Sequence, residues 1–245
     1  MKKIKQLMVI AIDGPAAVGK TTVGQKLAQE LGFVCFDTGI MYRAVTFAVI
    51  QSGIDYRDEV RVSELAWKLN IDILPPSQHD GRMNDVLIDG TDVTWQIRQP
   101  EVNNLVSEVS AYPEVRKAMT EQQRKIAAKG SIVMLGRDIG SVVFPKAPCK
   151  VYLDASQEVR AERRFAEEQA ANRDISYQQV LDSIRHRDEL DSKRKTAPLV
   201  IPEDALVINT DRLSAEEVVD VILDFYRTCQ NKLVVAFRGQ KKGNL

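Results

Sequence analysis

The sequence predicts an α/β fold in three layers, with a central parallel sheet, a small antiparallel insert and a helical lid. The first observation behind this prediction is the apolar run at 7–12, which leads through a glycine-bracketed loop into a helical pattern. Short apolar runs and helical segments then keep alternating, as in parallel sheets with right-handed crossovers. Only the stretch from 54 to 113 departs from this texture, and its short runs and turn signals predict the insert.

The loop that follows the first predicted strand has the composition of a phosphate-binding loop. Gly14, Gly19, Lys20 and Thr21 match the pattern G-x-x-x-x-G-K-[ST]. The glycines let the backbone curl so that N–H groups face phosphate oxygens, and Lys20 adds a charge for the β- and γ-phosphates. Thr21 offers a hydroxyl oxygen to Mg²⁺ and is the predicted metal ligand.

A chance glycine turn would not be flanked by a buried strand and by a helix predicted over 20–31, with Gly32 at its end. We therefore predict a P-loop NTPase core that binds ATP and Mg²⁺. The residues predicted to bind the nucleotide are consecutive: Gly14, Pro15, Ala16, Ala17, Val18, Gly19, Lys20, Thr21 and Thr22.

The remaining elements follow from apolar periodicity and from glycine or proline breaks. Further strands of the parallel sheet are predicted at 33–36, 131–135, 150–153 and 206–208. Helices are predicted at 40–52, 59–69, 101–111, 114–129, 157–169, 177–190 and 214–229. The insert contributes short strands at 71–74 and 86–88, followed by the turn Asp89-Gly90.

These elements predict one domain over 1–230, with the parts 1–53 and 114–230 (core), about 54–113 (insert) and about 157–176 (lid). We expect the insert to bind the acceptor nucleotide, because inserts at the active edge usually carry function. Residues 231–245 fit either a docked extension or a frayed basic tail, and the tail is favoured.

The composition excludes several classes of protein. Lys plus Arg and Asp plus Glu both number 34, so a general nucleic-acid-binding surface is disfavoured. Three scattered cysteines and two histidines support neither a disulfide framework nor a zinc site, and they fit a reducing cytosol. No apolar run approaches the length of a membrane span, and no heptad pattern indicates assembly. We expect a cytoplasmic monomer that acts on small molecules.

Arginines and acids gather in three clusters at predicted strand ends or on the helices that follow them. The clusters are Thr38 with Arg43, Arg137 with Asp138, and Arg187 with Asp191 and Arg194. Each arginine taken singly is typical of a solvated surface. Beside a phosphate loop, the three clusters together predict a second phosphate site, because the arginine fork binds two phosphate oxygens at once.

A further group, Arg160, Arg163 and Arg164, shares one face of the predicted helix at 157–169. This face is either an exposed surface paired with neighbouring glutamates or part of a lid that closes over the transferring group.

Two facing phosphate sites imply phosphoryl transfer, between two nucleotides or from a nucleotide to a phosphorylated small molecule. Such an acceptor is already ionised near neutral pH, so no general base is required.

Six segments, in this order, resemble those of bacterial cytidylate kinases: IDGPAAVGKTT, DTGIMYRAV, IRQPEVNNLVSEVSAYPEVR, GRDIGSVVFPKA, DASQEVRAERR and RDELDSKRKTAPL. The match runs from about Leu7 to Tyr226. The resemblance implies a nucleoside-monophosphate kinase core with an enlarged acceptor-binding insert. It also implies transfer from ATP to CMP or dCMP, with Mg²⁺, giving ADP and CDP or dCDP in pyrimidine nucleotide metabolism.

The resemblance also implies roles for single residues. Residues that would read cytosine are Ser107, Arg116 and Asp138, and residues that would clamp the CMP phosphate are Arg43, Arg137 and Arg194. Arg187 and Asp191 would contact the ribose hydroxyls, and Thr38 would lie near the acceptor. The expected catalytic residues are Lys20, Arg137, Arg163 and Arg194. A carboxylate or hydroxyl with an arginine can distinguish cytosine from uracil, whose hydrogen-bonding edge is reversed.

Two positions depart from the family pattern. Leu135 stands before Gly-Arg-Asp where the family commonly has an acid that would hold metal-bound water. Thr21 with Asp13 or Asp37 could replace that acid, and Leu135→Asp should raise turnover or metal affinity if the acid matters. Ile40 stands where alanine is usual and adds bulk. The alternatives are another small-molecule or nucleotide kinase, or a catalytically weak nucleotide-binding relative.

Overall fold

The computed structural model describes residues 7–240, and it describes side chains only through residue 230. The chain divides into two compact units. The first contains the described parts of Met1–Asp37, Ala127–Ser192 and Ala197–Leu245, and the second contains Thr38–Ile126 with Lys193–Thr196. Each unit is described by itself.

The first unit is built on a parallel five-stranded sheet in the order β2-β6-β1-β7-β8. Its strands are β1 (Val9–Asp13), β2 (Val34–Asp37), β6 (Ile132–Gly136), β7 (Cys149–Asp154) and β8 (Leu206–Asn209). All five predicted strands are confirmed, with ends displaced by at most two residues. In the register, Asp13 lies beside Gly136, and Asp37 lies beside Leu135. The carboxyl ends of β1, β2 and β6 therefore form one edge, where parallel sheets place their ligand sites.

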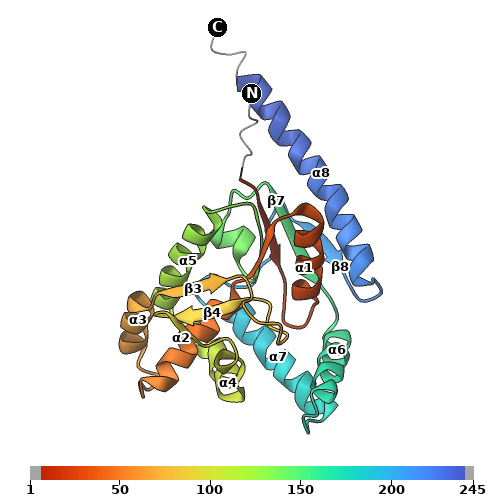
Figure 1. The fold of residues 1–245 in the computed structure, drawn as a ribbon. Helices are drawn as coiled ribbons and strands as arrows, with labels where there is room; N and C mark the ends of the chain where they lie inside the picture. The colour runs from red at the N-terminus through yellow and green to blue at the C-terminus, as the bar shows by residue number, and fades with distance from the viewer. Residues whose placement is uncertain (1–6, 241–245) are drawn as a thin grey trace. The chain divides into compact units, whose positions relative to one another are not determined.

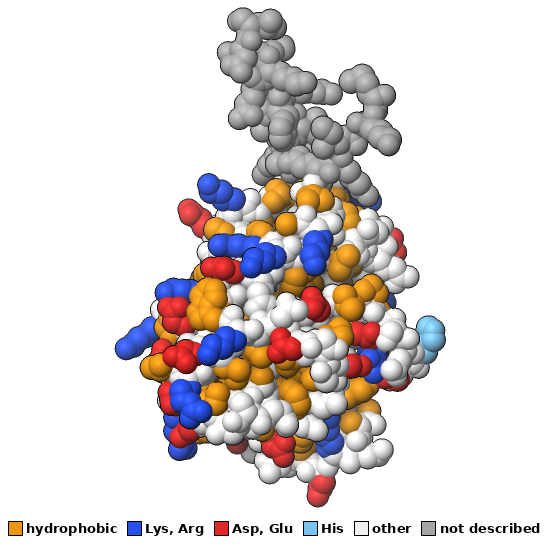
Figure 2. All heavy atoms as spheres, turned by 60° about the vertical axis from the view of Figure 1, so that its left-hand side comes forward, with side chains coloured by type: hydrophobic (Ala, Val, Ile, Leu, Met, Phe, Trp, Pro, Cys, Tyr) orange, Lys and Arg blue, Asp and Glu red, His pale blue; other side chains and the backbone are white. Residues whose placement is uncertain are grey.

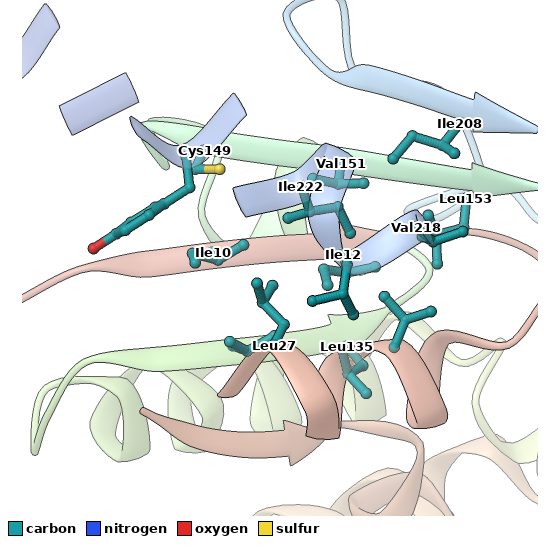
Figure 3. Packing of buried hydrophobic residues seen from close by; sticks show 14 of the residues in the cluster. Ile10, Ile12, Leu27, Leu135, Cys149, Val151, Leu153, Ile208, Val218 and Ile222 are labelled. Carbon is teal, nitrogen blue, oxygen red and sulfur yellow. The ribbon is translucent and has the colours of Figure 1, made fainter. Parts of the chain in front are cut away.

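Helices flank this sheet (Figure 1). They are α1 (Lys20–Leu31), α6 (Gln157–Ala170), α7 (Tyr177–Lys193), α8 (Ala215–Gln240) and the π-helical turn η2 (Ile139–Val143). Figure 3 shows apolar side chains of α1, α8 and the strands pointing toward one another on one face of the sheet. The alternation along β1 sends Ile10 and Ile12 into this core and turns Asp13 to the opposite face.

The ends of two helices confirm the boundaries predicted from sequence. Gly32 closes α1 in a left-handed conformation, and its N–H donates to the carbonyl oxygens of Ala28 and Gln29. At the start of α8, Ser214 and Glu217 exchange hydrogen bonds of 2.8 and 3.2 Å in a capping box. The predicted end of this helix at 229 is wrong, because α8 continues to Gln240. The prediction for 241–245 lies outside the described residues.

The second unit contains the antiparallel sheet β3-β4-β5 (Ile71–Leu74, Asp85–Ile88 and Thr91–Asp92). Asp89 and Gly90 both have positive φ, as a two-residue hairpin requires. Its helices are α2 (Gly39–Gln51), α3 (Glu59–Lys68), η1 (Gln96–Arg98), α4 (Pro100–Val109) and α5 (Pro113–Ala127). This unit is wider than the predicted insert at about 54–113, because α2 packs against α3, α4 and η1.

The segment at 75–84, which joins β3 to β4, is organised around Arg82. This side chain is buried, and its guanidinium binds the carboxylates of Asp80, Asp85 and Asp92 at 2.7–3.1 Å. Trp95 donates its indole N–H to Asp80 at 2.9 Å. A single cation therefore ties the loop to β4 and β5. In the part of the chain that the structure describes, no helix is long and apolar enough to cross a membrane.

Candidate functional site

The loop between β1 and α1 has the tight geometry that its glycines predict. A Cβ atom on Gly14, which has a φ of 150°, would overlap the carbonyl oxygen of Leu153 on β7. Gly19 has a φ of 94° and is the N-cap residue of α1, whose first turn includes Lys20 and Thr21. The start of α1 is thus joined to the loop, as in a helix N-terminus that binds phosphate.

Lys20 is half-buried within this loop. Its Nζ donates to the carbonyl oxygens of Gly14 at 2.8 Å and Pro15 at 2.6 Å. Burial lowers the pKa of Lys20 well below its usual value, and the positive charge of Arg137 lowers it further. Three carboxylates, Asp37, Asp13 and Asp191, act in the opposite direction. Lys20 therefore lies where charges of both signs meet.

Thr21 and Asp37 offer oxygen ligands at the carboxyl edge of the sheet. The Thr21 hydroxyl donates to Oδ2 of Asp37 at 3.4 Å. A hydroxyl and a carboxylate are hard oxygen donors of the kind that Mg²⁺ takes beside phosphate oxygens and water. Within residues 7–240, no group of three or more His, Cys, Asp or Glu is placed to hold a metal ion. The Thr21 hydroxyl and the Asp37 carboxylate fit a metal that is bound by these oxygens together with a nucleotide.

Asp13, which the sequence suggested as a second metal-site acid, has a different environment. Its carboxylate is 1 % exposed and accepts the N–H groups of Ile139 and Gly140 at 2.8 and 2.7 Å. Burial raises its pKa to about 6, although both backbone hydrogen bonds act against this rise. Both oxygens of Asp13 are thus engaged by the turn that follows Arg137 and Asp138.

A cluster of positive charges lies next to the phosphate loop. Arg137 donates from Nε to Asp191 of α7 at 2.8 Å. Burial lowers the pKa of Arg187, and the charge of Arg137 is the next cause. Arg137 thus repels both Lys20 and Arg187, so its charge is felt at both of these side chains. The structure brings together four predicted residues of the first unit, Lys20, Arg137, Arg187 and Asp191.

The three arginines of α6 that were predicted to share one helix face bind different partners. Arg160 is buried and donates to Asp188 of α7 at 2.6 and 3.0 Å, and to the carbonyl oxygen of Ala16 at 3.2 Å. Arg163 binds the hydroxyl and the carbonyl oxygen of Thr210 at 3.0 and 2.6 Å.

Arg164 pairs with Glu167 and Glu168, as in the exposed-surface alternative. The three arginines therefore have three different environments, and the catalytic role of Arg163 stays a prediction.

In the second unit, residues predicted to bind the acceptor gather around α2, α4 and α5. Arg43 donates to the side chain of Asn103 on α4, and Ser107 lies one turn further along that helix. Arg116 is 3 % exposed, donates to the carbonyl oxygen of Ser110 at 2.9 Å and stacks 5.0 Å from the ring centre of Tyr42.

Two further predicted residues belong to this unit. Thr38 is the N-cap residue of α2 and is buried, and Arg194 is half-buried within Lys193–Thr196. The sequence analysis missed Asn103, which accepts the hydrogen bond from Arg43. Its only signal in the sequence was its position four residues before Ser107, which places both residues on one face of a helix. The partner of Arg160, Asp188, had no signal in the sequence, because it lies 28 residues away in the next helix.

Leu135 occupies the apolar core. Its side chain is 0 % exposed and packs with Ile12 and Leu27 between the sheet and α1 (Figure 3). A Cβ atom on Gly24 of α1 would lie 2.6 and 2.9 Å from the two Cδ atoms of Leu135. The second departure, Ile40, is buried on α2. Leu135 therefore fills a space that a glycine leaves open.

Comparison with known proteins finds relatives that match nearly the whole chain. A family model described as "Cytidylate kinase" matches residues 10–228. The chain is 48 % identical over 218 residues to a protein named cytidylate kinase from Caldanaerobacter subterraneus subsp. tengcongensis, covering 89 % of this chain and 94 % of that protein. A protein of the same name from Bacillus subtilis is 42 % identical over 221 residues, covering 90 % of this chain and 97 % of the relative.

Proposed function

The chain belongs to the cytidylate kinase family, and from that premise we propose that Lys20 and the three basic clusters direct phosphoryl transfer from ATP to CMP or dCMP. The products are ADP and CDP or dCDP. In this step a phosphate oxygen of the acceptor forms a bond to the γ-phosphorus of ATP, and the bond from that phosphorus to the β–γ bridging oxygen breaks. Such a step requires mainly alignment and neutralisation of negative charge.

The observation that carries the proposal is the group of cations beside the phosphate loop. Arg137 repels both Lys20 and Arg187, and its Nε donates a hydrogen bond to the carboxylate of Asp191, which offsets part of this positive charge. A phosphate carrying two negative charges would relieve this repulsion. In the donor site, the loop at 14–22 holds the ATP phosphates. Mg²⁺, held through Thr21 and with Asp37 nearby, would supply charge neutralisation there.

The proposal also gives single residues roles toward the acceptor nucleotide. Arg43, Arg137 and Arg194 bind the CMP phosphate, and Arg187 with Asp191 binds the ribose hydroxyls. Cytosine is read by Ser107, Arg116 and Asp138, because a carboxylate accepts from the cytosine amino group and an arginine donates to its ring acceptors. The buried setting of Arg116 supports this role, since desolvated polar groups discriminate strongly against a ligand that leaves them unpaired. Arg163 is proposed to approach the phosphates only if it leaves Thr210.

We also propose that the protein acts as a cytoplasmic monomer on small-molecule substrates. The zero net charge, and the mixture of charges of both signs on the face shown in Figure 2, support small molecules rather than a polyanion as the substrates.

The test is ADP production from ATP and Mg²⁺ with CMP, dCMP, UMP and AMP in parallel. CMP-selective ADP release would support the proposal and would show that Leu135 is tolerated. Preference for AMP would favour another nucleotide kinase. If ATP binds but no acceptor stimulates ADP release, the proposed activity fails and a catalytically weak relative is favoured. Lys20→Met is the control, and we expect turnover to fall at least about 100-fold because a charge at the transferring group is lost.

A further inference from the structure

Asp13 joins two segments that the proposed function uses separately. It is the last residue of β1 and directly precedes Gly14, the first residue of the phosphate loop. Its two carboxylate oxygens accept the N–H groups of Ile139 and Gly140, which lie 126 and 127 residues away in the chain. Those N–H groups open the turn η2 immediately after Asp138. One side chain therefore links the base of the donor loop to the segment that carries Arg137 and Asp138.

Stability alone does not explain a carboxylate at this position. Burial raises the pKa of Asp13 to about 6, which means that the charged form is disfavoured in the folded protein. The negative charge of Asp138 adds to this effect, whereas the two N–H groups and Lys20 oppose it. A neutral side chain would avoid the cost of desolvation, but it could not accept both N–H groups with two equivalent oxygens.

The linked turn has little freedom to move. A Cβ atom on Gly140 would lie 3.1 Å from Cγ of Pro202, 3.2 Å from Cδ of Lys150 and 3.3 Å from Oδ2 of Asp13. Lys150 is itself fixed by Asp204 at 2.7 Å. The turn thus packs closely against Pro202 and Lys150 and is hydrogen-bonded by Asp13. This arrangement fixes the backbone that leads back to Asp138 and Arg137.

We propose that Asp13 is a positioning residue that holds Arg137 and Asp138 in register with the phosphate loop, and so aligns the acceptor with the γ-phosphate of ATP. The inference rests on the proposed acceptor roles of Arg137 and Asp138. In this role Asp13 acts through the N–H groups of residues 139 and 140 and not by contact with a substrate. A displacement of about 1 Å at such a remote support can reduce turnover on the order of 100-fold.

The test variant is Asp13→Asn, which keeps the size of the side chain but turns an NH₂ group toward one of the two N–H donors. We expect KM for CMP to rise at least about 10-fold and kcat to fall, with KM for ATP changing less than about 3-fold. The CMP/UMP selectivity should fall as well, because Asp138 is displaced. Amide hydrogen exchange at residues 139 and 140 should become faster.

A second variant tests the same link without changing charge. Gly140→Ala places a methyl group against Asp13 and Pro202, and we expect it to raise KM for CMP in the same direction. Gly140→Ala also tests the proposal if Asp13→Asn does not fold. Asp224→Asn is the matched control, because it makes the same change of residue type at an exposed carboxylate, paired with Arg227, and leaves the Asp13 link intact. It should leave KM for CMP and the CMP/UMP selectivity unchanged.

The proposal is overturned if folded Asp13→Asn or Gly140→Ala retains the CMP affinity and CMP/UMP selectivity of the parent protein. It is also overturned if KM for ATP rises as much as KM for CMP, since that pattern would mean general damage to the site. Arg137→Ala and Asp138→Asn distinguish this result from a failure of the proposed function. If those two variants leave CMP use unchanged, the acceptor roles assigned to the two residues are wrong.

Discussion

Buried charges beside the phosphate loop are held by backbone groups. Asp13 accepts two N–H groups, Lys20 donates to two carbonyl oxygens, and Arg160 donates to two more. A charge that leaves water needs such partners, because an unpaired buried charge would cost several kcal/mol or change its protonation state. Asp13 has such partners, and burial nevertheless raises its pKa.

This raised pKa gives a pH dependence of stability with a defined sign. The pKa of Asp13 rises from 3.8 to about 6 on folding, so the folded state binds its proton more tightly than the unfolded state. The resulting destabilisation is fully present above pH 6 and is relieved as the pH falls toward 3.8. Relative to Asp13→Asn, the parent protein should therefore gain on the order of 1 kcal/mol between pH 7 and pH 5. Urea unfolding of both proteins at the two pH values measures this, and a pH-independent difference would contradict it.

Arg82 gives a second prediction for a single side chain. It is 8 % exposed and is bound by three carboxylates, so Arg82→Ala should leave these negative charges facing one another. We expect lower thermal stability and faster proteolysis between 75 and 84, because the link from this loop to β4 and β5 is lost. Arg227→Ala, which breaks the exposed pair with Asp224, is the control and should have little effect. Equal effects of the two substitutions would refute the structural role of Arg82.

At the scale of elements, α1 and β6 are fitted to each other through Gly24 and Leu135. Alanine is favoured over glycine in a helix by about 1 kcal/mol, but a methyl group at Gly24 would meet both Cδ atoms of Leu135. We expect Gly24→Ala to destabilise the parent protein by roughly 1–2 kcal/mol, since overpacking exceeds the gain in propensity. In a Leu135→Ala background, the same change should instead stabilise. Urea unfolding of the four proteins tests this inversion of sign, and additive effects would exclude the coupling.

The same packing changes what is expected of an acid at 135. The sequence suggested that Leu135→Asp would raise turnover or metal affinity if an acid matters at this position, yet the side chain of Leu135 lies in the apolar core between β6 and α1. A carboxylate there should lower the free energy of unfolding by several kcal/mol, and by more than Leu135→Ala does. Urea unfolding compares the two variants. Tighter Mg²⁺ binding by a stable Leu135→Asp protein would show instead that the side chain can reach the nucleotide.

Local patterns predicted the elements better than the contacts between them. The strand at 131–135 and the helix at 20–31 were predictable because apolar periodicity and a terminal glycine act over a few residues. The phosphate loop was predictable for the same reason. The link from Asp13 to residues 139 and 140 was not, because it depends on β1 and β6 lying side by side. The grouping of α2 with the insert likewise depends on packing that no local pattern records.

For the whole molecule, equal numbers of acidic and basic residues mean that ligand binding relies on local charge. On the face shown in Figure 2, charges of both signs are interspersed. Substrates of high negative charge therefore depend on the few cations placed at the site, such as Lys20 and Arg137. Each substrate should consequently stabilise the folded protein through its own set of residues.

Thermal unfolding with single substrates tests this separation. At 100 times its dissociation constant a ligand adds about 2.7 kcal/mol, and for a chain of this size that corresponds to a rise in Tm of roughly 5–10 °C. We expect such a rise with ATP and Mg²⁺ and, separately, with CMP. Lys20→Met should lose most of the ATP-dependent rise while keeping that for CMP, whereas Arg43→Ala should do the reverse. Loss of both responses in either variant would mean that the two substrates do not bind through separate groups of residues.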